Sequence, residues 1–176
     1  MLCVVSALCL IEAQAYGGNA NEHTRYGYVN LNGVDMWKAS WYGEYPTYTG
    51  ANVMIVDSSI CILQERHHFD TFGEHDAGAR LRDYLQGLSD GTVLVGVSCN
   101  SAEVHLSDAI PTLSALGADV SSVGFRGAWV FAAVKGDPSE TVIDKQFTEA
   151  GEANARQPRI SVTFGMCDLL QKITLS

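Results

Sequence analysis

Acidic side chains surround four of the five histidines, so metal binding is the first chemistry to consider. These histidines are His67, His68, His75 and His105. A zinc site needs ligands that converge at a defined spacing, such as two histidines one helical turn apart. No such spacing occurs, and the neighbours His67 and His68 would point to opposite faces of a strand. The sequence therefore predicts no metal and no cofactor.

Nucleophilic and hydrolytic chemistry has little support in the sequence. No serine lies in a G-x-S-x-G elbow, and no glycine-rich phosphate-binding motif occurs. Glycoside hydrolysis needs two carboxylates facing one cleft, about 5–10 Å apart, and the acidic residues lie instead in expected turns and helix caps. We therefore predict that the protein is not an enzyme, and a glycan hydrolase is the weakest alternative.

Arg126 is the most distinctive polar residue outside these groups. It stands in a corner flanked by Gly124 and Gly127, just before the apolar run that contains Trp129. Glycines let a backbone turn sharply or approach a ligand, and a guanidinium can donate a planar fork to hydroxyls or to a carboxylate. The alternative is that Arg126 only bonds loop carbonyls and fixes the corner.

The stretch 41–48 is rich in aromatic residues, with one tryptophan and three tyrosines. Such side chains can stack on the apolar faces of sugars. They can equally cover one end of the core, since amphipathic aromatics are common at half-buried positions. The sequence leaves both interpretations open.

Composition limits the partners. The chain has 176 residues, 47% of them hydrophobic, and a net charge of −9 at pH 7. This length and composition fit one domain with a core. An acidic surface repels phosphate backbones and anionic lipid, so we expect neither nucleic acid nor a membrane surface as a partner.

Residues 1–15 form an apolar run that ends in Ala13-Gln14-Ala15, the A-x-A pattern of a signal-peptidase site. Its apolar core is about ten residues long, too short for a bilayer, which needs about 20. We therefore expect a signal peptide over residues 1–15, a flexible mature N-terminus over 16–25, and a secreted, extracellular protein without membrane insertion. The alternative is a buried N-terminal strand.

Removal of that peptide would leave three cysteines, which are Cys61, Cys99 and Cys167. In an oxidising compartment this odd number allows one disulfide and one free or intermolecular thiol. All three are disulfide candidates, and a Cys-linked homodimer is one expected outcome. Their long spacings leave the pairing open.

Strands dominate the expected secondary structure. Asn32-Gly33 is a hairpin or bulge signal within 26–37. A second hairpin is expected from 52–57 and 60–69. Unbroken apolar runs at 92–97 and 128–134 predict strands buried on both faces.

Two short helices are expected among these strands. An apolar stripe at helical spacing predicts one that opens with 74–76, whose acidic residues suit its first turn, and that ends at Gly87 or Gly91. Ser107 is a candidate N-cap for the other, which Gly117 ends. The stretch 137–156 is polar with few apolar anchors, and 160–164 is expected to be a last edge strand. The result is an α+β domain with helices packed on a sheet.

Several segments together resemble one known family in their order and spacing. They are 50–53, 69–71, 91–93, 105–108, 113–117, 124–126, 129–132 and 135–136. They are similar to the interleukin-like epithelial–mesenchymal transition inducer domain, also called the pancreatic-derived-factor-like or GG domain. The resemblance covers residues 26–136 and weakens toward Cys167. It implies one domain over 26–167 with a tail at 168–176, and a compact β-β-α fold of two antiparallel sheets with short helices at the side.

The resemblance also implies a site. A sugar-binding member uses an arginine in the Gly-aromatic-Arg corner, which matches Arg126, and an aspartate in a strand-to-helix loop, which matches Asn100. An asparagine still accepts a hydrogen bond but supplies no charge. With Trp129 nearby, these are the expected carbohydrate-binding residues. They imply a lectin-like domain that recognises a glycan or glycoprotein. The alternative is a cytokine-like signalling protein that acts through protein contacts, since such secreted proteins belong to the same family.

Overall fold

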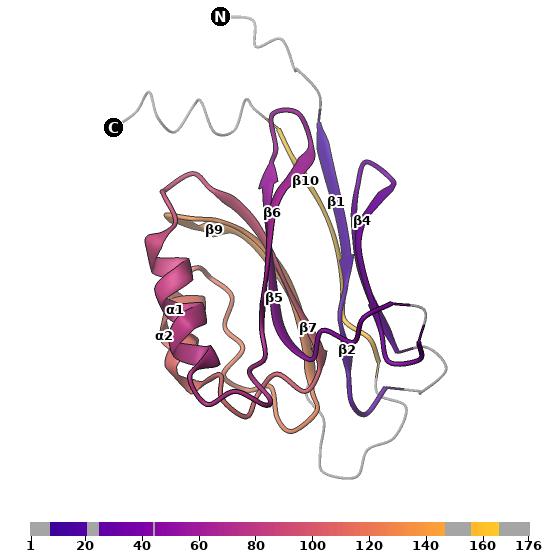
Figure 1. Ribbon diagram of the computed structural model, residues 1–176. Coiled ribbons are helices and arrows are strands. Elements are labelled where there is room, and N and C mark those ends of the chain that lie inside the picture. Colours follow the sequence, from indigo (N-terminus) through magenta and orange to yellow (C-terminus); the bar gives the residue numbers. More distant parts are fainter. Residues whose placement is uncertain (1–7, 21–24, 44, 147–155, 166–176) are drawn as a thin grey trace, which may run out of the picture.

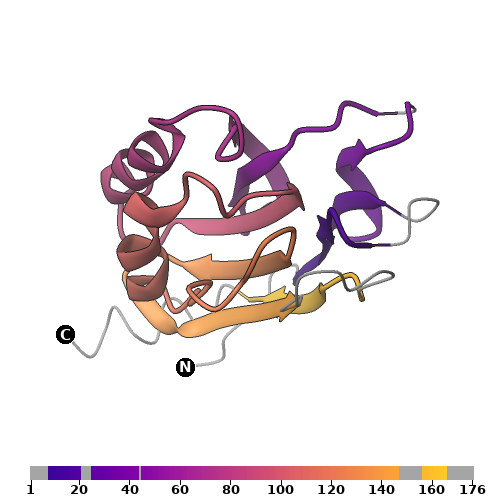
Figure 2. The same cartoon turned by 90° about the horizontal axis from the view of Figure 1, so that it is seen from below.

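The fold consists of two facing sheets with the helices on the far side of the larger one (Figure 1). It is seen in a computed structural model that describes residues 8–20, 25–43, 45–146 and 156–165. Figure 2 shows the same layers from below, with the two helices at one side and the purple ribbon of 25–43 at the other. The expected α+β fold of two antiparallel sheets with short helices at the side is confirmed.

The smaller sheet has four strands in the order β10-β1-β3-β4. They are β1 (Cys9–Gln14), β3 (Tyr26–Leu31), β4 (Val34–Ser40) and β10 (Arg159–Phe164). β3 and β4 form the predicted hairpin, because Asn32 and Gly33 both adopt the positive φ of its two-residue turn (50° and 78°). β10 is the predicted edge strand.

The larger sheet has the order β6-β5-β7-β8-β9, and β2 pairs in parallel with the end of β7. Its strands are β2 (Tyr16–Gly17), β5 (Gly50–Asp57), β6 (Ile62–Phe69), β7 (Val93–Asn100), β8 (Ala128–Val134) and β9 (Asp137–Gln146). β7 and β8 are buried on both faces, as their unbroken apolar runs predict. The hairpin of β5 and β6 is also confirmed.

The helices are α1 (Ala77–Gly87), a 3₁₀ turn η2 (Ser107–Ala109) and α2 (Ile110–Ala115). Leu81 and Leu85, from the predicted apolar stripe, are fully buried against the larger sheet. The predicted N-cap role of Ser107 is wrong. Ser107 is already inside the first turn, and no side chain caps that turn. Among the described residues, no helix has the length and apolar character needed to cross a membrane.

Two cores stabilise these layers, and β8 contributes to both. Val130 and Ala132 pack between the two sheets, whereas Trp129 and Phe131 pack between the larger sheet and the helices. This alternation follows from the period of two along a strand. It fixes β8 at the centre of the molecule and determines where the residues just before it can lie.

The N-terminal segment forms the buried strand that the sequence left as the alternative. β1 pairs with β10 on one side and with β3 on the other, and Ile11 and Ala13 are fully buried. Tyr16 is also fully buried and donates its hydroxyl to the carbonyl of Thr47 at 2.8 Å. The expectation of a flexible segment is therefore wrong for residues 16–20. Cleavage after Ala15 stays a prediction, but it would remove β1 from this sheet.

The cysteine pairing differs from the expectation for the same reason. Cys61 forms a disulfide with Cys9, which lies within the expected signal peptide. Cys99 is a free thiol and fully buried. Cys167 and the tail 168–176 lie outside the described residues. The Cys9–Cys61 pairing could not be expected from the sequence, because residues 1–15, which contain Cys9, have the pattern of a signal peptide.

Candidate functional site

Asn100 and Arg126 come together at one end of the larger sheet. Asn100 is the last residue of β7, and Arg126 lies in the corner that leads into β8. Because β7 and β8 are antiparallel neighbours, the end of one lies beside the start of the other. Both residues adopt a left-handed φ, 61° for Asn100 and 57° for Arg126. Few residues with side chains do so, so both positions depart locally from regular strand geometry.

Gly18 lies against the side chains of both Asn100 and Arg126. A Cβ atom on Gly18 would lie 2.7 Å from Arg126 Cδ and 3.0 Å from Asn100 Oδ1. The backbone N–H of Gly18 donates to the carbonyl of Asn100 at 2.5 Å, and β2 holds the preceding Gly17 beside Asn100. We call Gly18, Asn100 and Arg126 the corner site. The sequence did not reveal the role of Gly18, because it lies more than eighty residues before Asn100.

The Arg126 side chain is exposed and lies beside an aromatic ring. Its guanidinium carbon is 5.2 Å from the ring centroid of Phe125, whose side chain is 55% exposed. The corner itself is held by the N–H of Gly127, which donates to the carbonyl of Gly124 at 2.9 Å. None of the ion pairs found among the described residues involves Arg126. The corner site therefore offers a charged donor fork and an apolar ring face together.

The loop that follows Asn100 buries polar atoms that have no partner among the described residues. They are the hydroxyl of Ser101 and both carboxylate oxygens of Glu103. The loop is nevertheless fixed, because Thr71 donates its hydroxyl to the carbonyl of Ala102 at 2.8 Å. Unsatisfied buried polar groups are costly. Ser101 and Glu103 are therefore functional candidates. Sequence reasoning missed them, because no motif marks them.

Trp129 does not line the corner site, so that expectation is corrected. Its side chain is 1% exposed and its ring stacks on Phe131 with centroids 5.8 Å apart. Its backbone N–H is occupied as well, since it donates to the hydroxyl of Ser98 at 2.8 Å. The reason is the burial of β8 on both faces. Phe125 occupies the position near Arg126 that we had expected for Trp129.

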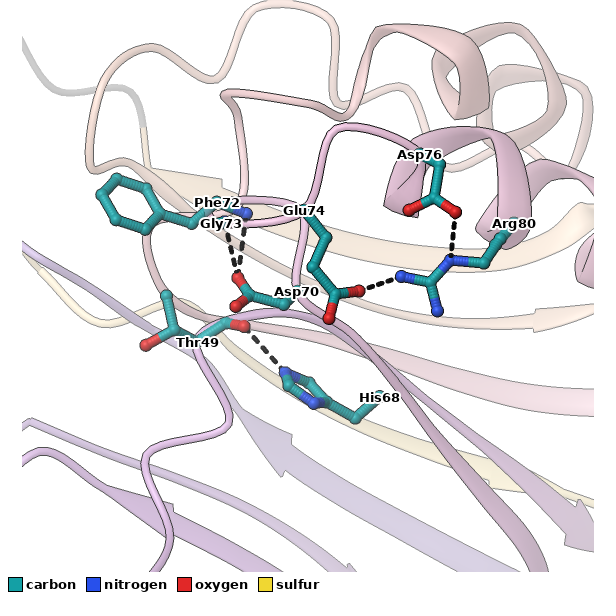
Figure 3. A network of polar contacts seen from close by, with 8 residues as sticks. All are labelled: Thr49, His68, Asp70, Phe72, Gly73, Glu74, Asp76 and Arg80. Atoms are coloured by element: carbon teal, nitrogen blue, oxygen red, sulfur yellow. Dashed lines mark hydrogen bonds and ion pairs between the residues drawn. The ribbon is translucent and has the colours of Figure 1, made fainter.

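Three acidic residues near the histidines, Asp70, Glu74 and Asp76, have partners other than histidine (Figure 3). Asp70 accepts hydrogen bonds from two backbone N–H groups of the following turn. Glu74 and Asp76 both pair with Arg80, and a ring nitrogen of His68 lies 2.8 Å from a backbone carbonyl oxygen. Within the described ranges, no group of three or more His, Cys, Asp or Glu side chains is placed to hold a metal ion.

The aromatic stretch 41–48 follows β4 on the smaller sheet. Tyr48 packs against the buried Trp37, with ring centroids 5.8 Å apart, so this end of the stretch covers the core. Trp41, Tyr42 and Tyr45 are exposed. The covering role therefore holds for Tyr48, and sugar stacking by the exposed part of the stretch stays a prediction.

The sequence of the chain contains an interleukin-like EMT inducer domain. Residues 49–137, about half of the chain, match the model of that family, Interleukin-like EMT inducer, and the chain belongs to it. The matched span runs from just before β5 to the start of β9, so it includes Asn100 and Arg126 but not Gly18.

The chain is also similar to two longer proteins. These are the cell migration-inducing and hyaluronan-binding proteins of Mus musculus and Homo sapiens, each 30% identical over 99 residues. Each match covers 55% of this chain but only 7% of the relative. This chain therefore spans only a small part of the length of either relative.

Proposed function

We propose that this chain is a non-enzymatic, lectin-like domain that acts outside the cell and recognises a glycan or glycoprotein through the corner site. The observation that carries the proposal is the meeting of Gly18, Asn100 and Arg126 from three separate segments. The name of the two relatives, which includes hyaluronan binding, supports a saccharide ligand. The Cys9–Cys61 disulfide supports a location where thiols are oxidised.

The chemistry of the corner suits a saccharide. The guanidinium of Arg126 can donate two parallel N–H groups to adjacent hydroxyls or to a carboxylate. The side-chain amide of Asn100 both donates and accepts, and the ring of Phe125 offers a face for sugar C–H groups. Because residue 100 is an asparagine and not an aspartate, it leaves the charge of Arg126 uncompensated. The corner therefore favours saccharides that carry a carboxylate.

A glycan array followed by titration calorimetry on the hits tests this proposal. We expect Arg126→Ala to weaken binding at least about tenfold, which is about 1.4 kcal/mol. Arg126→Lys keeps the charge but loses the planar fork, so it should weaken binding as well. Arg82→Ala is the matched control, because it removes a half-buried arginine on α1 that already pairs with Asp83. Failure to bind any saccharide, or undiminished binding by Arg126→Ala, contradicts the proposal.

Signalling through protein contacts is the second candidate, and exposed apolar side chains favour it. Phe72, Val104 and Phe125 are 45%, 46% and 55% exposed, and each lies on a loop that adjoins an end of the larger sheet's strands. Contiguous exposed apolar patches are typical of protein interfaces, and these three side chains are the candidates for such a patch. A partner that loses affinity with Phe72→Ser and Phe125→Ser, but not with Arg126→Ala, would support this function in place of saccharide recognition.

A Cys-linked homodimer is the covalent form of that candidate. Cys9 and Cys61 are bonded to each other, and Cys99 is buried, so none of these three is available at the surface. The linking thiol would have to be Cys3 or Cys167, both outside the described residues. Non-reducing electrophoresis of the Cys167→Ser variant tests this, and a dimer band that persists in it excludes Cys167.

A further inference from the structure

The outer face of the smaller sheet carries a groove formed by other residues than the corner site. It has a volume of about 580 Å³ and lies over β3, β4 and the loop that follows them. Four tyrosines line it, Tyr26, Tyr28, Tyr42 and Tyr45. We call it the tyrosine groove. The helices lie beyond the larger sheet, at the opposite side of the molecule (Figure 1).

The pleat of β3 turns these side chains outward. Val29 and Leu31 are buried between the two sheets, so Tyr28 and Asn30 point to the other face. On β4, Lys38 stands opposite Tyr28 in the strand register. A polar and aromatic surface on this face is therefore built into the hairpin and does not depend on the loop alone.

The rings of the tyrosine groove are held in place. Tyr26 and Tyr28 stack with centroids 6.1 Å apart and an interplanar angle of 23°. The ammonium of Lys38 lies 5.6 Å from the ring centroid of Tyr45. The N–H of Ser40 donates to the carbonyl of Pro46 at 3.3 Å, which folds the loop back toward the strand. Aromatic rings fixed in advance lose little conformational entropy when a ligand stacks on them.

Asn30, which lines the groove, has a side-chain oxygen without a hydrogen-bond partner among the described residues. The Oδ1 atom of Asn30 is buried and accepts nothing from the described residues. A buried acceptor without a donor costs free energy that a ligand hydroxyl can recover. The cations of the groove, in contrast, already have partners. Lys38 pairs with Asp35, and Arg25 donates to the carbonyl of Ala20 at 2.9 Å.

From this arrangement we propose that the tyrosine groove binds a neutral saccharide chain. Its sugar rings stack on the tyrosines, and one hydroxyl donates to Asn30 Oδ1. A neutral ligand avoids the repulsion of a protein whose net charge is −9, and it needs no charged partner in the groove, where Lys38 is paired with Asp35 and Arg25 is bonded to a backbone carbonyl. This second site is independent of the corner site, and either one can fail without the other.

Amide chemical-shift mapping with neutral trisaccharides tests the inference. The probes are cellotriose, mannotriose and triacetylchitotriose, with a glucuronate-containing oligosaccharide as the charged comparison. We expect at least one neutral trisaccharide to shift the amides of residues 25–43 in a saturable way. No such shift with any neutral probe overturns the inference.

Variants separate the tyrosine groove from the corner site. Tyr26→Ala and Asn30→Ala should each weaken that binding about tenfold, since each removes one of the central contacts. Thr163→Ala on β10 is the matched control, because Thr163 is exposed on the same sheet and does not line the groove. Arg126→Ala should also leave the groove affinity unchanged. Unchanged affinity in both groove variants, or loss of binding in Arg126→Ala alone, overturns the inference.

Discussion

Removal of the Cys9–Cys61 disulfide should destabilise the fold strongly. The two cysteines are separated by 52 residues in sequence, so the bond closes a long loop and attaches β1 to the turn between β5 and β6. In the chain-entropy description, closing a loop of this length stabilises a protein by about 4 kcal/mol. Typical domains are stable by about 5–15 kcal/mol. Reduction alone should therefore remove a large fraction of the stability.

Urea unfolding followed by tryptophan fluorescence measures this loss. Trp37 and Trp129 are buried, so their emission reports on both cores. We expect the free energy of unfolding to fall by about 4 kcal/mol when a reductant is added. The Cys9→Ala/Cys61→Ala double variant should unfold at a low urea concentration with or without reductant. The buried thiol of Cys99 forms no disulfide here and is present in both proteins.

The same experiment tests whether β1 belongs to the mature protein. An unfolding midpoint that reductant does not change would show that the Cys9–Cys61 bond does not stabilise the fold. So would a protein that begins at Tyr16 when isolated from cells and unfolds at the same midpoint, because it would lack both β1 and Cys9. Either result would favour the signal peptide that the sequence predicts over the strand that the structure shows.

Particular contacts lead to four further expectations. Gly17→Ala should destabilise the fold by about 1–3 kcal/mol, because its Cβ would lie 2.2 Å from the backbone oxygen of Arg126. Gly18→Ala should instead leave the free energy of unfolding nearly unchanged and weaken saccharide binding, because its Cβ would contact the movable side chain of Arg126. Equal urea midpoints for Gly17→Ala and Gly18→Ala would contradict this. Burial raises the pKa of the Cys99 thiol, so mass spectrometry should find no alkylation by iodoacetamide at pH 8 until denaturant is added. The guanidinium of Arg156, which donates hydrogen bonds to the Asp144 carboxyl, lowers the pKa of that carboxyl. The carboxylate therefore stabilises the fold above its ordinary pKa, and this stabilisation is lost as the pH falls through the lowered value. Asp144→Asn should cost about 1 kcal/mol at pH 7 and less at pH 2 in thermal unfolding, and an equal cost at both would contradict the assignment.

Local patterns predicted most of the fold, because turns, helix stripes and buried strands depend on neighbouring residues. Asn32-Gly33 supplied the two positive φ angles of a hairpin, and the unbroken apolar run of β7 indicated burial on both faces. The sequence did not predict β9, because its residues are mostly polar. β9 lies at the edge of its sheet and exposes much of its length. The apolar run of β1 has the composition of both a signal peptide and a buried strand, so local pattern could not separate them.

The site was less predictable, since it depends on contacts between distant segments. The family resemblance brought attention to Asn100 and Arg126, and the structure places both against Gly18. No local signal linked Gly18 to them, because the link is the parallel pairing of β2 with the end of β7. Trp129 was placed wrongly for a related reason. Its nearness to Arg126 in sequence was clear, but the direction of its side chain follows from the pleat of β8.

Whether the corner site recognises a glycan can be measured by amide chemical-shift mapping with a glucuronate-containing oligosaccharide. We expect saturable shifts at the amides of Gly18, Asn100 and Arg126, and we expect these shifts to disappear in Arg126→Ala while the rest of the spectrum stays unchanged. Shifts that avoid these three amides, or that persist undiminished in Arg126→Ala, would contradict the claim that this corner recognises a glycan.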